Sequence, residues 1–168
     1  MLTKKIEDAL NHHLTEEFES AYLYLSVASY FSSIELPGFA HWMKIQYEEE
    51  MYHTMKFYDF LELRDGRVRL AGLKAPKVDW ASPIEAFSQV FAHEQLISSK
   101  IHELVDLSLK EKDHATNNFL QWFVSEQVEE EATTKGILSR LKMIGDSTSS
   151  LLMLDQELSK RVFVPPEK

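Results

Sequence analysis

The 168-residue sequence contains no cysteine. Disulfides, zinc–thiolate sites, iron–sulfur clusters and thiol nucleophiles are therefore excluded, and any metal ion must be held by oxygen and imidazole ligands. Basic residues are also scarce, with 18 Lys and Arg against 27 Asp and Glu and a net charge of −9. Because this balance repels a phosphate backbone and attracts cations, we expect no nucleic-acid partner.

Long apolar runs are missing too. No stretch approaches the roughly 18 apolar residues of a membrane span, and the chain does not start with a basic and then apolar signal pattern. We therefore expect a cytoplasmic protein with no membrane partner. The hydrophobic content of 44% is sufficient for one sizeable core, which predicts a single domain over residues 1–168.

Glycine and proline number only five each, so they leave long segments uninterrupted. Within these segments apolar residues recur at steps of three and four, which predicts an all-α fold. The segment 66–81 lacks this rhythm and is long enough to run the length of a helical bundle. A single long crossover is typical of a ferritin-like four-helix bundle, here with a short C-terminal fifth helix. The expected helices span residues 3–34, 38–64, 82–112, 113–144 and 148–161.

An acidic residue interrupts the apolar stripe of each long helix near its midpoint. Each lies three or four residues from its apolar neighbours, so it should point inward, and the four should converge at one depth of the bundle. His53 follows one of them by three residues and shares its face. The four inward residues are Glu17, Glu50, Glu94 and Glu130.

Carboxylates buried together repel one another and require a positive partner or a proton. Lys and Arg are absent from residues 6–43, 78–99 and 113–134, so the chain offers no obvious basic partner. Oxygen-rich ligands with an imidazole suit iron or manganese, and a dinuclear site fits best. The remaining histidines show no carboxylate partner at helical spacing, and we expect solvated or capping roles for them: His12, His13, His41, His93, His102 and His114.

Three stretches resemble the ferroxidase segments of the non-haem bacterial and archaeal ferritins: residues 17–24, 47–53 and 119–131. The resemblance covers essentially the whole chain. It implies that Glu17, Glu50 and His53 hold a first iron, and that Glu50, Glu94 and Glu130 hold a second, with Glu50 bridging.

The same resemblance implies a weaker third iron site and two further residues beside the ligands. Tyr24, on the same stripe as Glu17, either donates an electron during oxygen chemistry or only packs its hydroxyl against a carboxylate. Gln127 lies beside the ligands, where the Glu of a second Glu-x-x-His would be. The third site would consist of Glu49, Glu126, Glu129 and Glu130.

The function implied by the resemblance is iron storage with ferroxidase activity. Two Fe(II) would bind per chain, dioxygen or hydrogen peroxide would oxidise them, and the Fe(III) would leave as hydrated oxide. By the same resemblance, 24 chains would form a hollow shell with octahedral symmetry.

Several alternatives remain. A rubrerythrin-like peroxidase and a haem-containing bacterioferritin both keep a second Glu-x-x-His, whereas this chain has Gln127-x-x-Glu130. Met51 occupies the place of the haem-ligating methionine of bacterioferritins, but the missing motif argues against haem. A mini-ferritin would leave the bundle centre free of ligands, which conflicts with four inward glutamates. A helical scaffold with protonated glutamates is the non-metal alternative.

Overall fold

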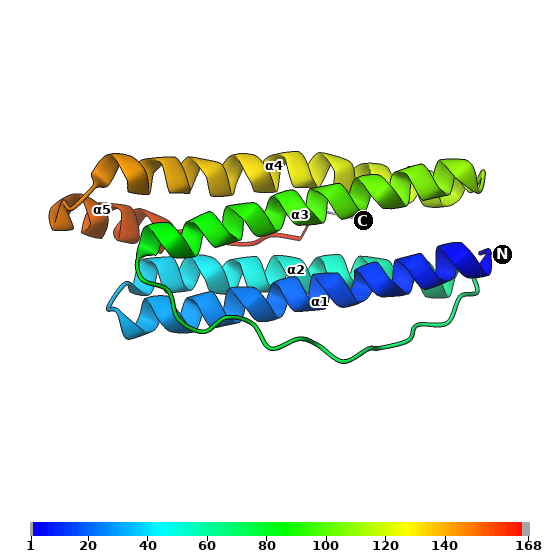
Figure 1. The fold of residues 1–168 in the computed structure, drawn as a ribbon, viewed down its shortest axis with the longest axis horizontal. Coiled ribbons are helices and arrows are strands. Elements are labelled where there is room, and N and C mark those ends of the chain that lie inside the picture. Colours follow the sequence, from blue (N-terminus) through cyan, green and yellow to red (C-terminus); the bar gives the residue numbers. More distant parts are fainter. Residues whose placement is uncertain (1, 166–168) are drawn as a thin grey trace.

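The computed structural model describes residues 2–165 and contains five helices with no strand in that range. Figure 1 shows α1 beside α2 and α3 beside α4, with the two pairs forming one bundle and α5 at its end. The predicted four-helix bundle with one long crossover and a short fifth helix is therefore confirmed. The helices are α1 (Lys4–Ser33), α2 (Pro37–Leu63), α3 (Pro83–Lys110), α4 (His114–Ile144) and α5 (Thr148–Leu158).

The largest difference from the expected bounds is at α5, which stops at Leu158 rather than near residue 161. The chain then leaves the helix and runs back along the bundle toward its middle (Figure 1). This returning segment, residues 161–165, is called the C-terminal tail below. No pattern in the sequence predicted the course of this segment, because its contacts are with residues far away in the chain.

Polar side chains begin four of the helices. Thr3, Ser82, Asp113 and Ser147 each accept a hydrogen bond from a backbone N–H of the following turn. The crossover between α2 and α3 runs the length of the bundle over α1 (Figure 1). Asn11 of α1 fastens it, because its side chain donates to the carbonyl of residue 67 and accepts from the N–H of residue 69. None of the helices in residues 2–165 combines the length and apolar character of a membrane span.

The apolar core is divided into two clusters along the bundle axis. One surrounds Phe31, Phe39 and Phe87 at the end of the bundle that carries α5. The other contains Leu14 and Phe57 and lies toward the N-terminus of α1. A layer of buried polar side chains joins the two clusters, and it includes Glu17, Glu50, His53, Glu94, Gln127 and Glu130.

The start of α2 depends on a contact with α5 rather than on a local cap. Leu36 precedes the helix and offers no side-chain hydrogen bond. Instead the buried carboxylate of Asp155 accepts from the N–H of Phe39 at 2.9 Å. A Cβ on Gly38 would lie 1.7 Å from the backbone oxygen of Asp155, so only glycine permits this approach.

Replacing Gly38 with alanine should push α5 away from α2 and lower the free energy of unfolding by about 1–3 kcal/mol or more, the usual cost of overpacking. Gly136→Ala is the matched control, because a Cβ there meets nothing within 4 Å. In a helix interior that change should stabilise the chain by about 0.5–1 kcal/mol. Thermal unfolding of both variants is the measurement, and equal melting temperatures would contradict the steric account.

Candidate metal centre

The pair of helices α1 and α2 brings three of the expected ligands together. Glu17, Glu50 and His53 each offer a ligand atom, and these atoms lie within 4.8 Å of one another. Their exposed fractions are only 1%, 3% and 2%. Because two carboxylate oxygens and one imidazole nitrogen converge in a buried space, the three side chains could hold a cation.

The helices α3 and α4 supply Glu94 and Glu130 to the same polar layer. The hydroxyl of Tyr24 donates to one oxygen of Glu94, and the amide of Gln127 donates to the other at 3.2 Å. Gln46, which the sequence analysis did not single out, donates to Glu130 at 3.0 Å. These three donors orient the carboxylates without neutralising them.

Burial changes the protonation of these carboxylates. Burial first, and then the nearby charges of Glu94 and Glu17, raise the pKa of Glu50 well above its ordinary value. Burial and the charge of Glu94 do the same for the pKa of Glu130. Burial also raises the pKa of Glu94 to about 7, although Tyr24 and Gln127 oppose the rise. The metal-free centre therefore holds protons that a cation must displace.

Glu17 behaves differently because of His13, and here the expectation of a solvated or capping role is wrong. The His13 ring is buried, with Nε2 at 2.9 Å from Glu17 and Nδ1 at 3.2 Å from Glu16. Burial alone would lower the pKa of His13, but the two carboxylates raise it to about 9. The hydrogen bond from His13 in turn keeps the pKa of Glu17 below its ordinary value despite burial.

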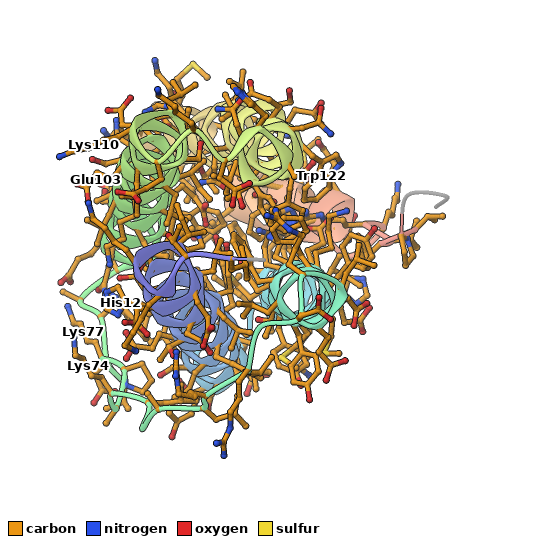
Figure 2. All side chains as sticks on the ribbon, turned by 90° about the vertical axis from the view of Figure 1, so that its right-hand side faces the viewer. His12, Lys74, Lys77, Glu103, Lys110 and Trp122 are labelled. Carbon is orange, nitrogen blue, oxygen red and sulfur yellow. The ribbon has the colours of Figure 1, made fainter. Side chains whose placement is uncertain are left out.

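Three of the four residues implied for the third iron site line one cavity. Glu49, Glu126 and Glu129 line a cavity of about 370 Å³ together with His53, Trp122 and the C-terminal tail, whereas Glu130 is not part of its lining. Figure 2 shows Trp122 on the side of the bundle opposite His12.

Glu49 also has a basic partner that the local sequence did not reveal. Arg161 of the tail forms an ion pair with it, and the guanidinium lies 4.3 Å from the centre of the Trp42 ring. The third set of carboxylates, those implied for the third iron site, is thus partly neutralised by a basic side chain of the same chain.

The group of inward glutamates differs from the third set of carboxylates, because it has no basic side-chain partner of this kind in the described residues. Within residues 2–165, no Lys or Arg bonds to Glu17, Glu50, Glu94 or Glu130, and one oxygen of Glu17 is buried without a hydrogen-bond partner. Inward carboxylates from all four long helices, joined by a single crossover, are typical of the di-metal carboxylate class of helical bundles.

Comparison with known proteins agrees with this class. The family model described as Ferritin-like domain matches residues 7–144, and the chain therefore belongs to the ferritin family. It is 40% identical over 161 residues to a bacterial non-heme ferritin of Bacteroides fragilis strain 638R, covering 96% of this chain and 100% of that one. A protein of the same name from Staphylococcus saprophyticus is 37% identical over 163 residues, covering 97% and 98%.

Two solved structures are similar throughout. An engineered closed form of the Archaeoglobus fulgidus ferritin matches with a TM-score of 0.97 and 49% identity, over 98% of this chain and 100% of that one. The open-pore ferritin of the same archaeon matches with a TM-score of 0.96 and 49% identity, over 96% and 100%.

The raised pKa values generate a prediction about proton release. At pH 6.5 the binding of divalent cations should release protons, because Glu50, Glu94 and Glu130 must lose theirs to coordinate. Affinity should therefore rise between pH 6 and pH 8, and fewer protons should be released at the upper end. Anaerobic calorimetry with Co(II) in two buffers of different ionisation enthalpy measures the release. A Glu62→Gln variant, altered at an exposed position of α2, should behave as the parent does. Affinity independent of pH would contradict the assignment.

Proposed function

We propose that this chain oxidises Fe(II) at a dinuclear centre inside its bundle and stores the product as hydrated ferric oxide within a shell of 24 copies. The observation that carries the proposal is the buried group of Glu17, Glu50 and His53, with Glu94 and Glu130 opposite. The family of the chain supports it, since the relatives are named as non-heme ferritins.

The proposed ligand sets are asymmetric. Glu17, Glu50 and His53 hold the first Fe(II), and Glu50, Glu94 and Glu130 hold the second, with Glu50 shared between them. The first set contains the imidazole and the carboxylate whose pKa is lowered, so it accepts a cation with less displacement of protons. The second contains only carboxylates that hold protons when metal-free, and it should bind its ion more weakly.

The oxidation needs little movement of the protein. Holding two Fe(II) side by side lets dioxygen or peroxide take an electron from each ion, and the carboxylates neutralise the added charge of Fe(III). Tyr24 and Gln127 keep Glu94 turned toward the centre, and Gln46 does the same for Glu130. The nearness of Tyr24 to this carboxylate suits either a structural role or the donation of an electron.

Assembly is supported by apolar side chains that the single chain leaves exposed. Met143 at the end of α4 and Met153 in α5 are 78% and 71% exposed, and Leu70 in the crossover is 69% exposed. Large exposed apolar side chains that gather in a patch are typical of protein–protein contacts, and Met143 and Met153 line the same cavity. Neighbouring copies in a shell would cover them.

Storage is tested by adding aerobic Fe(II) in large excess over two ions per chain and separating the product by size-exclusion chromatography with iron detection. We expect the excess oxidised iron to co-elute with a particle about 24 times the chain mass. Saturation near two ions per chain on a small oligomer would instead indicate a di-iron enzyme such as a rubrerythrin-like peroxidase.

A Glu130→Ala variant tests the assigned ligands in the same experiment. It removes one ligand of the second ion, so the assembled particle should form while the rate of oxidation falls. Unchanged oxidation by a folded Glu130→Ala chain would contradict the assigned centre and favour a scaffold with protonated glutamates.

The proposed third iron site comprises Glu49, Glu126, Glu129 and Glu130, and Arg161 competes for it. Because the guanidinium already pairs with Glu49, Arg161→Gln should strengthen binding of a third ion about 10-fold, equivalent to about 1.4 kcal/mol. The matched control is Arg140→Gln, which breaks an Arg–Glu pair on the exposed surface at α5. Anaerobic Co(II) titration should show the gain only for Arg161→Gln, and equal third-ion affinity in both variants would refute the competition.

A further inference from the structure

His13 is held on three sides in the interior of the bundle. Its Nε2 lies 2.9 Å from Glu17 Oε1, and its Nδ1 lies 3.2 Å from Glu16 Oε2. The ring packs against Phe57, with ring centres 4.8 Å apart. One hydrogen bond to Glu17, one ion-pair contact to Glu16 and one packing contact to Phe57 thus orient the imidazole.

Glu16 has two further side-chain partners, Lys100 and His12. Lys100 of α3 forms an ion pair with it, and His12 lies 3.1 Å from the same carboxylate. Glu16 is thereby held between α1 and α3, with its second oxygen beside Nδ1 of His13.

The network of His12, His13, Glu16 and Lys100 lies under the surface formed by α1 and α3. His12, His13, Glu16, Lys100 and Glu103 line a cavity of about 250 Å³, and Figure 2 shows His12 and Glu103 on the same side of the bundle. The network is thus on the opposite side of the metal centre from Trp122 and the C-terminal tail.

The two oxygens of Glu17 have different surroundings. Oε1 accepts from His13, while Oε2 is buried and has no hydrogen-bond partner among the described residues. An oxygen already engaged by a donor is a poorer metal ligand than a free one. Glu17 offers one carboxylate oxygen to the same group of ligand atoms as Glu50 and His53, and Oε2 is the oxygen that His13 leaves available.

We propose that His13 is a positioning residue that restricts Glu17 to binding the first metal ion through Oε2 alone. The inference rests on the proposed function, since it concerns the same centre. His13 touches no metal ion itself and acts only through Glu17, with Glu16 and Lys100 holding the imidazole from behind. Partners of this kind in other metal sites change metal affinity about 10–100-fold when removed.

The test compares His13→Leu, which removes both donors, with His13→Gln, whose amide nitrogen can replace Nε2. Anaerobic Co(II) titration of the assembled protein gives the affinity of each ion, and the visible absorption bands report its coordination. We expect His13→Leu to bind the first Co(II) about 10–100-fold more weakly. The visible absorption bands of Co(II) bound to His13→Leu should also weaken. Glu17, no longer bonded to His13, can bind the ion through both oxygens, and this raises the coordination number of the ion.

His13→Gln should restore most of the affinity and the original spectrum. Glu103→Gln is the matched control, because this exposed side chain lines the same cavity and has no bond to His13, Glu16 or Glu17 in residues 2–165. In aerobic Fe(II) kinetics we expect His13→Leu to raise KM more than it lowers kcat, since the lost interaction serves binding.

If His13→Leu fails to fold, the Co(II) affinities of His13→Gln and Glu16→Gln test the proposal instead. Glu16→Gln removes the charge behind the imidazole and should weaken the first ion while keeping the fold. The proposal is overturned if His13→Leu binds Co(II) as the parent does, or if His13→Gln folds but is not rescued. Failure of the parent itself to bind two ions would overturn the proposed function instead, so the two failures are distinguishable.

Discussion

Glu50, Glu94 and Glu130 lie in the interior of a helical bundle with no Lys or Arg bonded to them within residues 2–165. An uncompensated charge at that depth costs several kcal/mol, so the metal-free chain must keep protons on these groups and draw its stability from elsewhere. The two apolar clusters on either side of the polar layer provide it. Metal binding removes the same cost, because a divalent cation replaces the protons. The fold is therefore a rigid frame for a centre that is unfavourable until it is occupied.

The centre is divided into two electrostatically different halves. On the α1 side, the bonded His13 keeps Glu17 ionised in advance. On the α3 and α4 side, neutral donors orient the carboxylates: Tyr24 and Gln127 contact Glu94. Neutral donors fix geometry but do not stabilise a negative charge as a cation does. One half is thus prepared for a cation, while the other becomes charged only as its cation arrives.

The sequence predicted the helices and the inward direction of the four glutamates, because both follow from steps of three and four along one chain segment. His13 could have been found by the same reasoning, since Glu16 and Glu17 follow it at spacings of three and four. Other contacts could not. Arg161 reaches Glu49 across 112 positions of the chain, and Asp155 reaches Phe39 across 116. Contacts of this kind depend on where α5 and the tail return, which no local pattern specifies.

The charged side chains on the two sides of the centre also differ. On the side formed by α1 and α3, the charged His13 and Lys100 stand behind the ligands and present positive charge to an ion. On the other side, the cavity of about 370 Å³ begins at His53 and is lined by Glu49, Glu126 and Glu129. Burial and mutual repulsion raise the pKa of Glu126, so negative charge at this side is concentrated and unfavourable without a cation. An ion at the dinuclear centre proposed above would therefore meet positive charge in one direction and carboxylates in the other. The C-terminal tail lies along this second path, and Arg161 is the one tail residue paired with a carboxylate there among those described. Because Arg161 pairs with Glu49 and with none of Glu17, Glu50, Glu94 and Glu130, it reduces the negative charge of this cavity without contacting the ligands proposed for the dinuclear centre.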